Sequence, residues 1–185
     1  MSVSKPLLNY FVKYGFIKNL NMTKENIRFT ITSKNAKQYI INFGIWLELY
    51  VYIHAKKINA FTNVVLGAMI DWDAYDGVVM ASNEFDIIVN DNSMPVFISC
   101  KMRDADTAAL NELVVAKKRF GGWFSKCVLV SFGKEKEKQI GTLQRANQLG
   151  IAMLDKKDIL SNNFGERLVN VIRQQDLLSL KWIKI

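Results

Sequence analysis

The chain has 185 residues and a mass of 21.2 kDa, with 50% hydrophobic and 23% charged residues. These values are typical of one globular domain, or of one domain with a small appendage, and they exclude a disordered or fibrous protein. The net charge of +8 is unevenly distributed, because residues 61–106 hold two basic and eight acidic residues between two basic flanks. This pattern suits a metal site that acts on a polyanion, and equally a soluble basic protein with an acidic loop.

Cysteine and histidine are scarce in the sequence. Cys100 and Cys127 cannot form a disulfide framework, and both lie in apolar, strand-like segments, as expected of reduced core thiols in a cytoplasmic protein. Because His54 is the single histidine, a bound metal ion would be held mainly by oxygen ligands, which favours Mg²⁺ or Mn²⁺ over Zn²⁺. We expect no membrane segment and no secretory signal, since the apolar runs are shorter than the roughly 20 residues that a membrane helix needs.

Hydrophobic periodicity and capping and turn residues predict the elements in chain order. The first 35 residues predict a small N-terminal appendage, with a short helix over 4–14 and a short strand over 26–32. Residues 36–185 predict one α/β domain, in which a run of strands is followed by strands that alternate with helices. This order predicts a mixed β-sheet flanked by helices on both faces. The predicted elements are a long helix over 35–57, strands over 62–70, 83–90 and 95–101, a helix over 106–119, a strand over 126–132, a helix over 135–148, a strand over 151–154, and one or two helices over 156–178.

Charged residues alternate with apolar ones on two neighbouring strands. Glu84 and Asp86 share one face of the strand over 83–90, and Ser99 and Lys101 share one face of the next strand. A hairpin with a four-residue loop at 91–94 would set Asp86 opposite Ser99 and Glu84 opposite Lys101. Unpaired charges are costly to bury, so this face is either a functional site or a solvent-exposed face with an ordinary ion pair.

Glu48 is the only charged residue between Asn42 and Ala55, inside an apolar helix. A lone ionisable residue in such a setting is usually paired or functional. The alternative is that Glu48 lies on a narrow solvated stripe of the helix. A helix packed on the sheet would bring Glu48 toward Asp86.

Four short motifs, in this order and spacing, are similar to those of one nuclease family. They resemble the PD-(D/E)XK phosphodiesterase domain of CRISPR ancillary effectors, in which this domain is fused to a CARF domain that senses cyclic oligoadenylate. The resemblance covers roughly residues 40–160 and implies a restriction-endonuclease-like fold. Residues 1–35 sit where the family has a small winged-helix-like segment, and we expect no cyclic-oligoadenylate sensor domain within this chain. The motifs are Gly44-Ile45-Trp46-Leu47-Glu48, Asn83-Glu84-Phe85-Asp86, Ile98-Ser99-Cys100-Lys101, and Gly121-Gly122 after the helix over 106–119.

The resemblance implies a role for each matching residue. Asp86 would bind a Mg²⁺ or Mn²⁺ ion at the scissile phosphate, Glu48 would complete the metal shell, and the main-chain carbonyl of Cys100 would be a further oxygen ligand. Lys101 would orient the attacking water, or help to deprotonate it, and offset the charge on the pentavalent phosphate. The family also implies an endonuclease that cuts DNA, with RNA as a further candidate substrate, a homodimer, and a role in defence against viruses or mobile elements.

This chain departs from the family pattern at Ser99, where the family has an acid two residues before the lysine. A hydroxyl is a poorer Mg²⁺ ligand than a carboxylate. Three outcomes stay open: Glu84 or Glu112 supplies the missing carboxylate, the site binds metal weakly with Asp86 and Glu48 alone, or the domain is a catalytically silent module for nucleic-acid binding or dimerisation. Glu112 itself can be interpreted as a solvent-facing helix residue.

Basic residues in the second half of the chain are candidates for a track that binds phosphates. Each residue alone is expected to be a solvated charge, but together they favour a nucleic-acid contact. Trp72, in the acidic loop over 71–77, is a candidate for stacking on a base, although an exposed loop without this role is the commoner interpretation. A third hypothesis is a DNA-binding regulator that uses residues 1–35. The basic candidates are Arg103, Lys117, Lys118, Arg119, Lys134, Lys136, Lys138 and Arg145.

Overall fold

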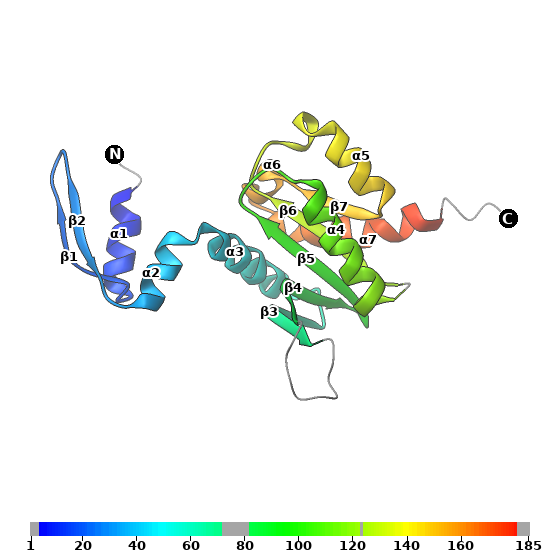
Figure 1. Ribbon diagram of the computed structural model, residues 1–185, viewed down its shortest axis with the longest axis horizontal. Helices are drawn as coiled ribbons and strands as arrows, with labels where there is room; N and C mark the ends of the chain where they lie inside the picture. Colours follow the sequence, from blue (N-terminus) through cyan, green and yellow to red (C-terminus); the bar gives the residue numbers. More distant parts are fainter. Residues whose placement is uncertain (1–3, 72–81, 123, 181–185) are drawn as a thin grey trace. The chain divides into compact units, whose positions relative to one another are not determined.

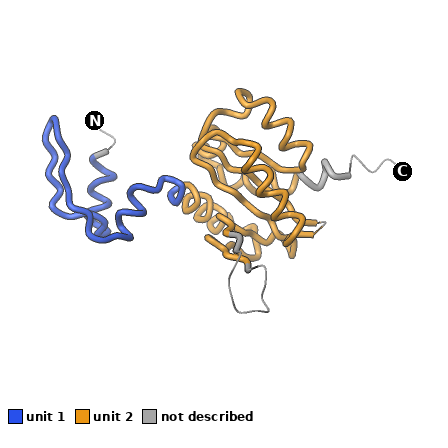
Figure 2. Tube along the Cα trace, in the orientation of Figure 1, with its two compact units in different colours: residues 1–46 blue, residues 47–185 orange. Residues whose placement is uncertain are grey.

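The computed structural model describes residues 4–71, 82–122 and 124–180. The chain divides into two compact units, residues 1–46 and residues 47–185 (Figure 2). The division lies inside helix α3 (Phe43–Lys57), whereas the sequence predicted a boundary after residue 35. The residues predicted to bind metal or to act in catalysis all belong to the second unit.

The first unit consists of a helix, a two-stranded antiparallel hairpin and a second helix. These are α1 (Ser4–Lys13), β1 (Ile17–Met22), β2 (Ile27–Ile31) and α2 (Lys34–Ile41). The predicted helix and strand correspond to α1 and β2, but β1 was not predicted. Its period-two pattern is broken by a register shift between Lys18 and Asn21, where Asn19 has a positive φ of 54°.

The helix predicted over 35–57 is interrupted at Asn42, so that α2 ends at Ile41 and α3 begins at Phe43. Asn42 has an extended backbone, and its side-chain oxygen accepts a hydrogen bond from the Gly44 N–H at 3.0 Å. An asparagine in this position acts as a helix N-cap. The prediction of one continuous helix is therefore wrong, because hydrophobic periodicity does not reveal a polar residue that caps a new helix.

The second unit is built on a mixed five-stranded sheet in the order β3-β4-β5-β6-β7, within the described residues (Figure 1). β4 is antiparallel to both of its neighbours, β3 and β5, and β5, β6 and β7 are parallel. The mixed sheet predicted from the sequence is confirmed. The strands are β3 (Asn63–Asp71), β4 (Ser82–Asp91), β5 (Met94–Lys101), β6 (Lys126–Ser131) and β7 (Ile151–Leu154).

Helices connect and flank the parallel strands of this sheet. The predicted helix over 106–119 keeps α-helical geometry only to residue 116 and then continues as a π-helical turn. In the described part of the chain, no helix is long and apolar enough to cross a lipid bilayer. The helical elements are α4 (Thr107–Ala116), the π-helical turn Lys117–Gly121, the 3₁₀ turn Lys136–Lys138, α5 (Ile140–Gln148), α6 (Lys156–Ile159) and α7 (Phe164–Leu180).

Buried side chains form two clusters, one on each face of the sheet. Ile98 of β5 belongs to the first cluster, together with Val51 of α3 and Leu168 of α7. Its neighbour Phe97 belongs to the second cluster, together with Leu113 of α4. Because successive side chains of a strand point to opposite faces, the sheet has helices packed on both sides, which confirms the predicted fold class.

The hairpin between β4 and β5 has the register that was expected from the sequence. It pairs Asp91 with Met94, so the loop contains only Asn92 and Ser93 instead of the four residues predicted. Both loop residues have positive φ values, 53° and 81°, as a type I′ turn requires. The turn fixes this register as far as the pair Ile87 and Ile98, and the expected pairs of Asp86 with Ser99 and of Glu84 with Lys101 lie beyond the end of the ladder.

The side-chain alternation on β4 changes at Asp86. Period two predicts that Phe85 and Ile87 share a face, but Phe85 packs against Phe97 in the second cluster while Ile87 lies in the first. Gly67 of β3 lies across from Asp86 and has a φ of +62°, which glycine adopts without strain. The pair of Gly67 and Asp86 is missing from the ladder that joins β3 to β4. Phe85 and Ile87 therefore pack on opposite faces of the sheet, and the prediction that these two side chains share a face is wrong.

Candidate active site

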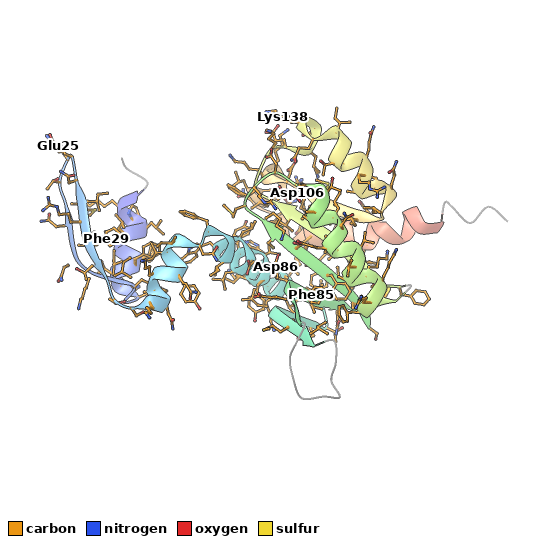
Figure 3. All side chains as sticks on the ribbon, in the orientation of Figure 1. Glu25, Phe29, Phe85, Asp86, Asp106 and Lys138 are labelled. Carbon is orange, nitrogen blue, oxygen red and sulfur yellow. The ribbon has the colours of Figure 1, made fainter. Side chains whose placement is uncertain are left out.

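The strands β4 and β5 separate at the candidate site. Their ladder ends with the pair Ile87 and Ile98, and beyond it β4 pairs only with β3 and β5 only with β6. Asp86, labelled in Figure 3, lies where the strands part. Its Oδ2 accepts a hydrogen bond from the Cys100 N–H at 2.6 Å and one from the Ser99 hydroxyl at 3.2 Å. The carboxylate therefore takes the place of a backbone acceptor for the Cys100 N–H.

Lys101 ends β5 beside helix α4. Its Nζ lies 3.3 Å from Oε2 of Glu112, and the two side chains are 26% and 64% exposed, respectively. The start of α4 is fixed by its N-cap Asp106, whose side chain accepts a hydrogen bond from the Ala109 N–H at 2.8 Å. The ammonium group is thus held by Glu112 while part of it stays open to solvent.

Glu48 approaches the same group of charges from α3. Burial raises the pKa of its carboxyl, the negative charges of Asp86 and Glu84 raise this pKa further, and the positive charge of Lys101 lowers it. Asp86, Glu84 and Lys101 are thus the charged groups whose electrostatic effect reaches the Glu48 carboxyl.

The Cys100 thiol is buried beside these charges. Burial, followed by the charges of Asp86 and Glu48, raises the pKa of this thiol well above its usual value. Burial likewise raises the pKa of the Cys127 thiol to about 12. Both cysteines are free and buried, as predicted for core thiols. Because a neutral thiol is a poor metal ligand, Cys100 would contribute to a metal site only through its main-chain carbonyl.

A cavity of about 730 Å³ lies beside these charges, between the strands β4 and β5 and helix α4. Its lining contains Asp86, Ser99 and Lys101, together with Glu84 and Glu112, the two residues considered for the missing carboxylate. The sequence analysis missed the remaining polar residue of the lining, Asn111. Positions 108, 111, 112 and 115 share one face of an α-helix, so the spacing from Glu112 was the signal that could have identified it.

The oxygen donors for a divalent cation are few. Among the residues that the structure describes, no three or more His, Cys, Asp and Glu side chains are grouped so that they could hold a metal ion. Mg²⁺ usually binds through one or two carboxylates and keeps several water ligands. Asp86 with Glu48 or Glu84 fits such a weakly held Mg²⁺ or Mn²⁺, and does not fit the nitrogen and sulfur ligands that Zn²⁺ prefers.

Four of the basic residues predicted to bind nucleic acid follow the C-terminal ends of the parallel strands β5 and β6, namely Arg103, Lys134, and Lys136 and Lys138 of the 3₁₀ turn. Arg103 follows β5 and forms an ion pair with Asp106. Lys134 follows β6 and forms an ion pair with Asp104 at 2.8 Å. Both are largely exposed, and their charges are partly balanced by these acids.

The other basic candidates lie elsewhere. Lys117, Lys118 and Arg119 belong to the π-helical turn that precedes β6, and are therefore separated from the C-terminal end of this six-residue strand by roughly 20 Å. Arg145 is exposed on α5. Trp72 lies outside the described residues. The structure thus divides the candidates between two ends of the sheet and does not gather them into one cluster.

Comparisons with known proteins give one family and a shared fold. The sequence model of a family described as "Card1-like, endonuclease domain" matches residues 34–174. The structure of protein VC1899 from Vibrio cholerae is similar at a TM-score of 0.68 and 22% identity, over 93% of this chain and 43% of that chain. Can2 from Sulfobacillus thermosulfidooxidans, solved in complex with cyclic tetra-adenylate, is similar at a TM-score of 0.63 and 22% identity, over 90% of this chain and 45% of that chain.

The present chain spans less than half the length of these two structures, and at this identity the likeness shows the fold alone. No curated protein has significant sequence similarity to the chain.

Proposed function

Because the chain belongs to the family of Card1-like endonuclease domains, we propose that it is a Mg²⁺- or Mn²⁺-dependent endonuclease of the PD-(D/E)XK type. Its proposed substrate is DNA, with RNA as a second substrate, and its proposed role is defence against viruses or mobile elements. The observation that carries the proposal is the position of Asp86 and Lys101 in the lining of one cavity where β4 and β5 part, and the charges of both residues act on Glu48 of α3. A carboxylate pair with a neighbouring ammonium suits phosphodiester hydrolysis, in which negative charge develops on the phosphate.

In this proposal, Asp86 holds the divalent cation, with the Cys100 main-chain carbonyl and Glu48 or Glu84 as further oxygen ligands. The cation, when bound, supplies positive charge that stabilises the phosphate in the transition state. The Cys100 N–H and the Ser99 hydroxyl both donate to Oδ2 of Asp86 and so fix its orientation before a substrate arrives.

Lys101 has two tasks in the proposed reaction. Its ammonium group orients the attacking water and offsets the charge on the phosphate as the new P–O bond forms and the leaving oxygen departs. Glu112, 3.3 Å from the Nζ, keeps this group at the mouth of the cavity. Because Glu112 is engaged with Lys101, Glu84 is the better candidate for the carboxylate that Ser99 does not supply.

A second candidate function is a catalytically silent module that binds nucleic acid or mediates dimerisation. It is favoured by Ser99, which removes one oxygen ligand from the family pattern, and by the small number of carboxylates near Asp86. The two functions differ in what the protein does to a bound strand.

Cleavage of end-labelled DNA and RNA, titrated with Mg²⁺ or Mn²⁺, tests the proposal. We expect metal-dependent cleavage that falls on the order of 100-fold in Lys101→Ala and is unchanged in the control Lys57→Ala, an exposed lysine at the end of α3. If Lys101→Ala cleaves like the wild type, the catalytic assignment is wrong. If the wild type binds strands but cleaves none with either metal, the silent module is the correct function.

We also propose that the chain forms a homodimer, by analogy with the family. Light scattering of the purified chain measures this directly. A monomer at micromolar concentration, with and without DNA, would contradict it.

A further inference from the structure

The cavity beside the candidate site extends along helix α4, beyond the charged residues. This helix contributes Ala108, Asn111, Glu112 and Val115 to the lining, a spacing that places them on one helical face. Glu112 lies within this series and marks the position of Lys101, because the two form an ion pair, and Ala108 precedes it by about one helical turn. Val115 follows about one helical turn, or roughly 5 Å, further along. The cavity therefore continues from the charged group into a region with different chemistry.

This second region has an apolar and aromatic lining. Phe85 lines it from β4, and its ring packs against Phe97 at 5.1 Å and against Phe120 at 5.6 Å between centroids. Leu113 and Val115 line it from α4, and Val115 remains 42% exposed. The core contacts of Phe85 hold the ring in place, so the apolar region is present before a ligand binds.

Asn111 adds a carboxamide to this lining. A carboxamide offers a donor and an acceptor side by side, and Asn pairs in this way with the edge of adenine in protein–DNA complexes. Aromatic and aliphatic side chains with one such polar group form the usual environment of an unstacked base in a protein.

We propose that this part of the cavity is a nucleobase subsite, in which a base of the bound strand lies between α4 and β4 and Asn111 contacts its edge. The inference rests on the proposed function for the position of the phosphate, which Asp86 and Lys101 engage. A base is the ligand that fits best, because the region is continuous with these charges and a base is covalently linked to the phosphate that they would bind. The volume of about 730 Å³ also lies within the range of sites for small molecules.

Binding in EDTA, where no metal-dependent cleavage occurs, tests the subsite. The measurement is fluorescence anisotropy with a labelled adenine 12-mer, a thymine 12-mer and an abasic 12-mer, which has the same phosphates and no bases. We expect the wild type to prefer the adenine strand over the abasic strand about fivefold or more, because base stacking and edge contacts are lost in the latter.

Two substitutions separate the subsite from other contacts with the strand. Val115→Trp fills the apolar region from an exposed position of α4 and should remove most of this preference, whereas Thr107→Trp, at an exposed position of the same helix outside the lining, should keep it. Asn111→Ala should reduce the difference between adenine and thymine strands by about 5- to 30-fold, whereas the control Asn147→Ala on α5 should not.

The subsite is contradicted if Val115→Trp and Thr107→Trp keep the same preference for bases, or if the wild type has none. The role of Asn111 is contradicted if Asn111→Ala and Asn147→Ala discriminate equally. These results are independent of the nuclease assignment, which is tested by cleavage with Mn²⁺. A protein that cleaves with Mn²⁺ but shows no preference for bases in EDTA lacks the subsite. A protein that shows this preference but never cleaves has the subsite without nuclease activity.

Discussion

Replacing Asp86 separates the structural role of its carboxylate from its proposed catalytic role. In the wild type, Oδ2 accepts the Cys100 N–H at 2.6 Å and the Ser99 hydroxyl at 3.2 Å. Asp86→Ala removes both the acceptor and the negative charge. Asp86→Asn removes the charge but leaves a carbonyl oxygen that can accept the same hydrogen bonds.

The magnitudes follow from these contacts. Cys100 is 5% exposed, so Asp86→Ala leaves its N–H buried without an acceptor, which costs about 2 to 3 kcal/mol. For a chain of this size, the melting temperature should then fall by about 4 to 12 °C. Asp86→Asn should lower the free energy of unfolding by about half as much as Asp86→Ala, or less. If Asp86 binds the cation, both variants lose several kcal/mol of transition-state stabilisation, a decrease in rate on the order of 100-fold or more.

Thermal unfolding and cleavage of a labelled strand in Mn²⁺ measure the two effects on the same preparations. Ser99→Ala is the matched control, because it removes only the hydroxyl donor and should lower the stability by about 1 kcal/mol or less. The reasoning is refuted if Asp86→Asn cleaves at the wild-type rate. It is also refuted if Asp86→Ala is as stable as the wild type, since the Cys100 N–H would then not depend on this carboxylate.

Three further predictions concern Glu112, Ser99 and Asp158. Glu112→Gln should change the stability by less than about 1 kcal/mol, because its ion pair with Lys101 is exposed, but should slow cleavage about tenfold; wild-type kinetics would contradict a positioning role. Ser99→Glu restores the family's acid and should lower the Mn²⁺ concentration needed for half-maximal cleavage; an unchanged metal dependence would contradict the expectation that this position lacks a ligand. Burial raises the pKa of Asp158, but hydrogen bonds from Lys136 and from the backbone outweigh this effect and hold it below its usual value. The stability that Asp158 contributes is therefore present above about pH 4 and lost as the pH falls through the lowered pKa. Urea unfolding at pH 7 should show Asp158→Asn to be about 3 kcal/mol less stable than the wild type, with a smaller difference at pH 3; a difference independent of pH would contradict the ion-pair explanation.

Much of the sheet could be predicted because its strands are short apolar runs bounded by turn residues. The strands over 83–90 and 95–101 and their register agree with β4 and β5, since a hairpin turn and the hydrophobic pattern together fix which residues pair. The motif order identified the family, which the match to residues 34–174 confirms. These features depend on local pattern and on spacing along the chain, both of which a sequence contains.

Features that depend on local backbone geometry could not be predicted in the same way. The cap at Asn42 divides one apolar segment into two helices, and Asn19 breaks the alternation of β1. At the site, the sequence placed Asp86 opposite Ser99. It did not predict that Phe85 and Ile87 would pack on opposite faces of the sheet, a change that occurs beside the positive φ of Gly67 on β3. The lining contributed by α4 was also missed, because the packing of a helix on a sheet is set by tertiary contacts.

The serine at position 99 and the parting of the strands have a common consequence for the site. Where the family has an acid, this chain has a hydroxyl that donates a hydrogen bond to Asp86, so the two side chains attract each other. A carboxylate at position 99 would instead be placed beside the Asp86 carboxylate, and the repulsion between them would favour protonation of one of them or the binding of a cation. With Ser99, the Asp86 carboxylate has two hydrogen-bond donors, and Lys101 has Glu112 as its partner. Both charged side chains therefore have partners within the protein itself.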